Sequence, residues 1–163
     1  MMENKVVVIP LKPEAGTKDV NYLMVEKPLY ASGSTQLEFP VGNVGQKEML
    51  EDAAKRVFLQ ETGYDPTWVK FLYAFFPNPQ GSNYRVSVFL GLALGESESA
   101  HATVELDGDA LLKRIRENEI VDGTSLAALS AILLQGEKAK SYLIQELTTT
   151  NEEAVISDRE QSE

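Results

Sequence analysis

The sequence predicts an α/β or α+β fold in which helices pack on a mixed β-sheet. Apolar runs of strand length dominate residues 6–94, one segment with helical periodicity lies among them, and further helical patterns follow from residue 108. This order of elements is typical of a sandwich in which helices cover the faces of a sheet.

Turn-forming residues separate the strand-like runs. The runs are rich in valine, leucine and aromatic residues, and stretches with Pro, Gly, Asp and Asn lie between them. A glycine-flanked loop is expected at residues 41–47. The predicted strands cover residues 6–11, 20–28, 36–40, 67–77, 84–94 and 103–106.

Helical periodicity begins after Met49. Apolar residues at 50, 53, 54, 57 and 58 follow the i, i+3, i+4 spacing of one helix face. Gly63 lies where a helix is expected to end in a left-handed cap. Later helices are predicted at residues 108–118, 123–136 and 137–147, and Asp, Ser or Thr capping residues open the first two.

Composition limits the classes of function. The chain has 163 residues with a net charge of −10 and shows no basic cluster, so no nucleic-acid partner is predicted. No apolar run is long enough for a membrane span, and the N-terminal run is expected to be a first strand rather than a signal peptide. The lack of cysteine excludes disulfides, thiolate metal sites and thiol catalysis. We expect a cytoplasmic protein without a membrane partner.

The domain organisation is predicted to be simple. Hydrophobic residues make up 43% of the chain, enough for one domain with a sizeable core, which we place at residues 1–147. Residues 148–163 form an acidic, polar tail with little to bury, and we expect this tail to be mobile.

A motif starts at Gly42. The chain resembles the Nudix hydrolase box, G-x5-E-x7-R-E-U-x-E-E-x-G-U with U a bulky aliphatic, through Gly42, Glu48, Arg56, Phe58, Glu61, Gly63 and Tyr64. The frame around the box resembles the ADP-ribose pyrophosphatase branch. The matching stretches are "EFPVG" before the box, a proline sixteen residues past Gly63, "FFPNPQGSNYRVSVFLGLAL" and "IVDGTSLAAL". The resemblance implies a Nudix-type α/β/α sandwich.

The resemblance also implies chemistry that this box only partly retains. Nudix enzymes cleave diphosphates with Mg²⁺ or Mn²⁺, which needs several oxygen ligands on one helix face. Those three helix positions map to Val57, Gln60 and Glu61, and only Glu61 keeps a carboxylate. The other ligands implied are the Gln60 side-chain oxygen and the backbone carbonyl of Val41. Any Mg²⁺ or Mn²⁺ is therefore expected to bind weakly.

Other positions follow from the same resemblance. Glu61 is the expected catalytic ligand or base, and a second catalytic acid would come from Glu96 or Glu98. Arg85 and Pro79 are the candidate substrate-binding residues, although an exposed strand-end arginine is an equally good interpretation of Arg85. The residues expected to brace the box are Gly42, Glu48, Arg56 and Gly63.

Two functions remain open from the sequence. The first is a Nudix hydrolase-like protein that acts on or binds a nucleoside diphosphate linked to another moiety, such as ADP-ribose, with low activity. The alternative is a catalytically inactive Nudix-fold protein that binds a nucleotide-like ligand or a protein partner. The substitutions at 57 and 60 leave enzyme status undecided, and a homodimer is also left open.

Overall fold

The computed structural model describes residues 4–14, 16–17, 19–30, 32–94, 102–130, 132 and 145. The chain divides into two compact units, Met1–Ala128 and Leu129–Glu163. The sheet and the helices described below lie in the first unit. Of the second unit, only residues 129, 130, 132 and 145 are described. The helix predicted at 137–147 and the tail at 148–163 thus lie outside the described residues, apart from the helical residue 145.

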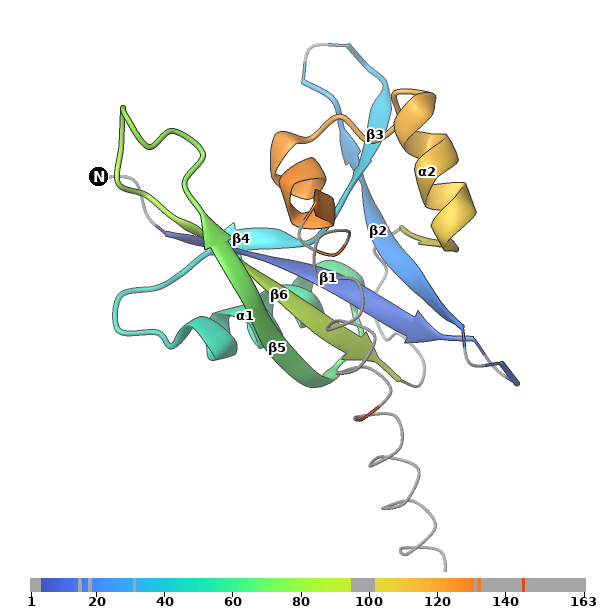
Figure 1. Ribbon diagram of the computed structural model, residues 1–163, viewed down its shortest axis with the longest axis horizontal. Coiled ribbons are helices and arrows are strands. Elements are labelled where there is room, and N and C mark those ends of the chain that lie inside the picture. Colours follow the sequence, from blue (N-terminus) through green and yellow to red (C-terminus); the bar gives the residue numbers. More distant parts are fainter. Residues whose placement is uncertain are drawn as a thin grey trace, which may run out of the picture. The chain divides into compact units, whose positions relative to one another are not determined.

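One mixed sheet organises the first unit (Figure 1). The five strands of its main path run in the order β3-β2-β1-β6-β5, β4 pairs with β1, and β7 pairs with β2. β1 and β6 are parallel, and the other pairs are antiparallel. The strands are β1 (Lys5–Pro13), β2 (Val20–Pro28), β3 (Thr35–Glu38), β4 (Val41–Asn43), β5 (Pro66–Phe75), β6 (Val86–Ala93) and β7 (Thr103–Leu106).

Helices cover both faces of this sheet. Val6 and Val8 of β1 belong to the buried cluster that includes α1 (Leu50–Thr62). Tyr73 lies on the opposite face of β5, where its hydroxyl donates to the carbonyl of Ala127 in the helical segment that starts at residue 123. The predicted fold class, helices on a mixed sheet, is therefore confirmed.

The sequence of α1 explains which face of the helix is buried and where the helix ends. Most of its apolar residues fall on one face, and Phe58 of that face is completely buried. The ring of Phe58 lies over Gly91 of β6, where a Cβ would come within 2.5 Å of it. Gly63 ends the helix with φ 76°, and its N–H donates to the carbonyl of Leu59 at 2.9 Å, a left-handed cap.

The loop expected at 41–47 is partly wrong, because its first three residues form β4. β2 pairs with β1 only near the end of β1, at Leu11–Pro13, so the first half of that edge of β1 has unpaired backbone groups. β4 pairs with this free edge. A three-residue strand that contains a glycine has too little pattern to be recognised in sequence.

The predicted helix at 108–118 corresponds to α2 (Gly108–Arg116). The Asp107 side chain accepts from the N–H of Ala110 and caps its start. Among the described residues, no helix is long and apolar enough to cross a bilayer.

Candidate functional site

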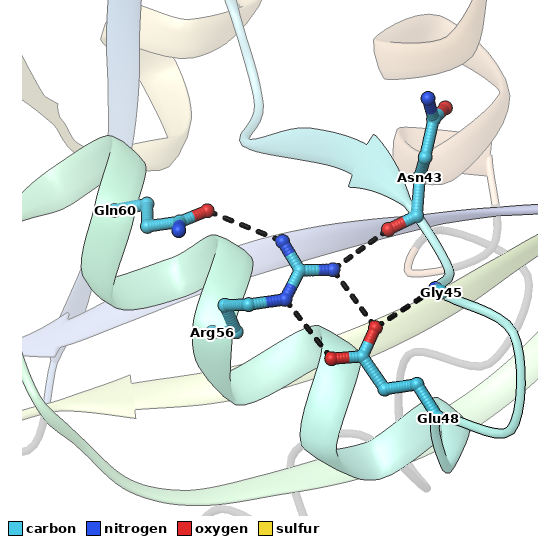
Figure 2. Close-up of polar contacts among 5 residues, drawn as sticks. All are labelled: Asn43, Gly45, Glu48, Arg56 and Gln60. Atoms are coloured by element: carbon cyan, nitrogen blue, oxygen red, sulfur yellow. Dashed lines mark hydrogen bonds and ion pairs between the residues drawn. The ribbon is translucent and has the colours of Figure 1, made fainter.

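Arg56 braces the loop before α1 to the helix. Its Nε and Nη2 groups donate to the two carboxylate oxygens of Glu48 at 3.0 and 2.9 Å, a bidentate ion pair (Figure 2). Glu48 Oε1 also accepts from the backbone N–H of Gly45 at 3.0 Å. The carboxylate thus holds the helix side chain and the loop backbone at once.

These contacts change the acidity of Glu48. The hydrogen bonds from Arg56, and then the one from Gly45, lower the pKa of the carboxyl from 4.5 to about 2. Both stabilise the charged form, so the group stays ionised far into the acid range.

Two further acceptors surround the same guanidinium. Nη2 of Arg56 donates to the backbone carbonyl of Asn43 at 2.7 Å, which ties β4 to α1. Nη1 donates to the Gln60 side-chain oxygen at 3.2 Å, and Figure 2 shows that oxygen directed at the guanidinium. The oxygen that Gln60 was expected to offer a metal is therefore engaged by Arg56.

Val57 is part of the core. It is 2% exposed and belongs to the buried cluster between α1 and the sheet. Its methyl groups lie against Gly42 of β4, where an added Cβ would come within 2.5 Å of Val57 Cγ2. The first metal position of the motif thus carries an apolar side chain that fills the space between helix and strand.

Glu61 keeps its carboxylate and forms an ion pair. The Nζ of Lys27, at the end of β2, lies 2.7 Å from Glu61 Oε2. That oxygen is fully covered, and the contact is an ion pair rather than a well-aligned hydrogen bond. Glu61 is the only one of the three box positions 57, 60 and 61 that is charged, and it already has a cation beside it.

Two more polar side chains come from β3. Gln36 lies directly opposite Lys27 in the β2–β3 ladder, and its Nε2 donates to Glu38 at 2.8 Å. The pKa of Glu38 is raised, mainly because the carboxyl is partly buried. The charges of Asp122 and Glu61 also raise this pKa, whereas the Gln36 hydrogen bond and the charge of Lys27 lower it. These residues share one electrostatic environment around the end of α1.

The carbonyl of Val41 has a defined direction. The N–H of Val8 donates to Pro40 and the N–H of Val44 donates to Asn4, so the residues on either side of β4 bond to β1 and the residue before it, in register with the Gly42–Val6 pair. The Val41 carbonyl then points away from β1. The carbonyl of Asn43, on the same edge, accepts from Arg56. Val41 is the only expected ligand that would bind through its backbone carbonyl, and this carbonyl is directed away from β1.

This donor set does not fit a resident divalent metal. Mg²⁺ and Mn²⁺ need several oxygen ligands at short range, about 2.0–2.1 Å for Mg²⁺. Here the three helix positions offer a buried methyl surface, an amide oxygen bound to Arg56 and a carboxylate paired with Lys27. No group of three His, Cys, Asp or Glu side chains that could hold a metal occurs among the described residues.

The predicted substrate-binding residues lie in the connection between β5 and β6. Pro79 is exposed there. The N–H of Arg85 donates to Asn4 Oδ1 at 3.0 Å, and its carbonyl accepts from Lys5 at 2.9 Å, which places Arg85 at the start of β1 and β6. The predicted acids Glu96 and Glu98 lie outside the described residues.

The sequence interpretation did not include Lys27, Gln36, Glu38 or Asn43 in the site. A signal for Lys27 was present. Leu23, Val25 and Lys27 occupy every second position of β2 and so lie on one face of the strand, where Leu23 and Val25 are buried. A lysine that continues a core-facing row is unusual and indicates a partner.

The NUDIX domain model matches residues 2–146 of this chain. The chain belongs to the Nudix family. A known protein from Bacillus methanolicus, the methanol dehydrogenase activator, is 24% identical over 127 residues, which are 73% of this chain and 69% of that protein. A crystal structure of an ADP compounds hydrolase has the same fold, with a TM-score of 0.63 at 15% identity over 82% of this chain and 75% of that one.

These findings confirm the resemblance drawn from the box and its frame. The chain is Nudix hydrolase-like in family and fold. Nudix hydrolases generally act with a divalent metal ion, and the helix positions that would hold it differ in this member.

Proposed function

We propose that this Nudix protein binds a nucleoside diphosphate linked to another moiety, of the ADP-ribose type, and hydrolyses it very slowly or not at all. The observation that carries the proposal is the state of the three helix positions. Val57 is buried in the core, the Gln60 oxygen is bound to Arg56, and Glu61 is paired with Lys27.

Electrostatics explains why hydrolysis suffers. A diphosphate gains negative charge on the leaving group as the bond breaks, and fixed positive charge must stabilise it. Loss of one electrostatic donor typically lowers the rate by roughly 10²–10³. Without the carboxylates that would recruit metal ions, several such contributions are absent together.

Ligand binding has separate support. The hydrogen bonds among Arg56, Glu48 and Gly45, here called the brace, keep the loop before α1 in place, which supports a binding role for that loop. The fold is also that of an ADP compounds hydrolase, which favours an ADP-containing ligand as the first one to try.

The test combines turnover with binding. Phosphate or nucleotide release is measured over a panel of nucleoside diphosphate derivatives that includes ADP-ribose, with Mg²⁺ and with Mn²⁺, and binding of the same panel is measured by calorimetry. We expect binding of at least one member and turnover far below the usual range of about 1–10³ per second. Any residual turnover should disappear in Glu61→Gln.

Two results would contradict the proposal. A turnover number within the usual range would show that other groups, such as Glu96 or Glu98, complete the site. A panel without any binding would remove the nucleotide ligand altogether.

A protein partner is the second candidate, and the relative from Bacillus methanolicus favours it, because its name describes an activator of another enzyme. The matching test adds this protein to methanol dehydrogenase and measures the dehydrogenase rate. A rate increase that survives in Glu61→Gln would support action through contact with a partner rather than through hydrolysis.

A further inference from the structure

We propose that Lys27 is a built-in counter-cation that takes the place of a divalent metal ion at Glu61. The inference concerns the site of the proposed function and rests on it only for the assignment of Glu61 to that site. In this view the site has exchanged a dissociable ion for a covalently attached ammonium group.

The contact itself is the first support. Lys27 Nζ lies 2.7 Å from Glu61 Oε2, and that oxygen is fully covered. Mg²⁺ holds its oxygen ligands at about 2.0–2.1 Å, so an ammonium group 2.7 Å away occupies the space from which an ion would bind this oxygen. An ion could reach this oxygen only by displacing the ammonium group.

The location of Lys27 is the second support. Leu23 and Val25, which precede it on the same strand face, are 1% and 2% exposed. The Lys27 side chain is 32% exposed, and the Glu61 side chain is 24% exposed. The strand therefore directs the lysine along a buried row toward the end of α1, and the pair is partly shielded from solvent.

Neighbouring charges give the third support. Glu38 interacts electrostatically with Lys27, Glu61 and Asp122. The charges of Asp122 and Glu61 disfavour the ionised form of Glu38, and the cation of Lys27 favours it. Lys27 supplies that cation permanently, whereas a metalloenzyme of this family takes it from solution.

The experiment uses Mn²⁺ alone as the probe, with the full chain and no nucleotide. Binding is measured by calorimetry or by the loss of the free-ion electron paramagnetic resonance signal. The wild-type protein should bind Mn²⁺ only at concentrations above about 1 mM at this site. Lys27→Met keeps an unbranched side chain, one atom shorter, and removes its charge, and we expect it to bind Mn²⁺ at least about tenfold more tightly.

Three control variants make the result specific. Lys12→Met removes a lysine whose Nζ is 3.2 Å from Glu105 elsewhere on the sheet, with the same change in net charge, and should leave Mn²⁺ affinity unchanged. Adding Glu61→Gln to Lys27→Met should abolish the gain. Lys27→Arg keeps the charge and should behave like the wild type.

The proposal is overturned if Lys27→Met, shown to be folded by circular dichroism and a thermal melt, binds Mn²⁺ no better than Lys12→Met. It is also overturned if the gain survives Glu61→Gln, or if the wild type binds Mn²⁺ tightly through Glu61. If Lys27→Met is unfolded, Lys27→Gln replaces it under the same criteria. Because no nucleotide is present, failure of the proposed ligand binding would leave this readout intact.

Discussion

The two sides of helix α1 have kept different parts of the same motif. On the side of the preceding loop, Arg56 still forms a bidentate pair with Glu48 and holds the backbone of Asn43. On the side that would face a metal, Val57 is buried and Glu61 is paired with a lysine. One set of contacts fixes the loop to the helix, and the other set would carry out the chemistry.

The difference shows that the motif contains two separable functions. In this chain Gly42, Gly63, Arg56 and Glu48 take part in how loop, strand and helix pack. At the later positions this chain carries Val57 and Gln60 in place of carboxylates, and the fold is present with them. A match to the box therefore reports architecture more securely than catalysis.

The largest effect is expected when carboxylates are returned to the metal-facing side. Val57→Glu combined with Gln60→Glu places a charge in the core, and we expect it to lower the free energy of unfolding by about 3 kcal/mol or more in EDTA. If the positions face a metal site, Mn²⁺ should restore part of this loss, because an ion that binds only the folded state stabilises it. Chemical denaturation with and without Mn²⁺ measures both.

Gln60→Glu alone is the matched control, since residue 60 is exposed. It should change stability by no more than about 0.5 kcal/mol. A double variant as stable as this control would show that position 57 tolerates charge and is not a true core position. A destabilised double variant that Mn²⁺ does not stabilise would show that the two positions do not face an ion.

Much of the fold could be predicted because its signals are local. The helix rhythm from residue 50 to the cap at Gly63, and the apolar runs of β1, β2 and β6, depend on neighbours in sequence. The exception within the frame is β4, whose three residues are strand only because β1 leaves an edge open beside them.

The site was less predictable because its contacts join distant segments. Glu48 and Arg56, which the spacing of the box singles out, are close in sequence, and the structure joins them by a bidentate ion pair. The approach of Lys27 to Glu61 depends on how β2 crosses the end of α1, which no local pattern encodes. The burial of Val57 against Gly42 similarly depends on the pairing of β4.

The next effect in size concerns the brace. Arg56→Ala removes the bidentate pair with Glu48 and the bond to Asn43, and we expect it to cost about 2 kcal/mol in the free energy of unfolding. Hydrogen bonds to charged groups contribute roughly 1.5–3 kcal/mol each, and partial exposure of this arginine reduces their sum. Urea denaturation measures the change.

Lys55→Ala is the control for this substitution. Lys55 is the neighbouring residue on α1, and its pair with Glu51 is 3.5 Å long and exposed. Pairs of this kind contribute about 0.3–0.5 kcal/mol. Equal losses in the two variants would mean that the brace stabilises the fold no more than an ordinary surface pair.

A smaller effect tests the contact between Gly42 of β4 and Val57 of α1. Gly42→Ala would bring a Cβ within 2.5 Å of Val57 Cγ2, and the β-branched valine has little freedom to move aside. We expect a loss of about 1–2 kcal/mol. In Gly42→Ala with Val57→Ala, the two costs should be less than additive, because the smaller side chain removes the clash.

Gly108→Ala provides the reference, because nothing lies within 4 Å of a Cβ at that position. It should be neutral or slightly stabilising in a thermal melt. Additive costs in the double variant at 42 and 57 would place Val57 away from β4.

The smallest effect is a dependence of stability on pH that comes from the brace alone. The pKa of Glu48 is about 2 in the folded protein, lowered from 4.5 by its bonds to Arg56 and Gly45. A depressed carboxyl pKa stabilises the fold above pH 4.5, and this contribution is lost as the pH falls from 4.5 through 2. Glu48→Gln should therefore be less stable than the wild type at pH 7, and the difference should shrink steadily as the pH falls below 4.5. Urea midpoints at pH 7, 4 and 3 measure it, with Glu51→Gln as a control for loss of an exposed carboxylate in the nearby first turn of α1. Because the loop is exposed, salt should weaken the effect.

A difference between Glu48→Gln and the wild type that stays constant from pH 7 to pH 3 would mean that the loop is held by geometry rather than by the charge of Glu48. The charge of Glu48 would then not be what distinguishes the loop side of α1 from the side that carries Val57.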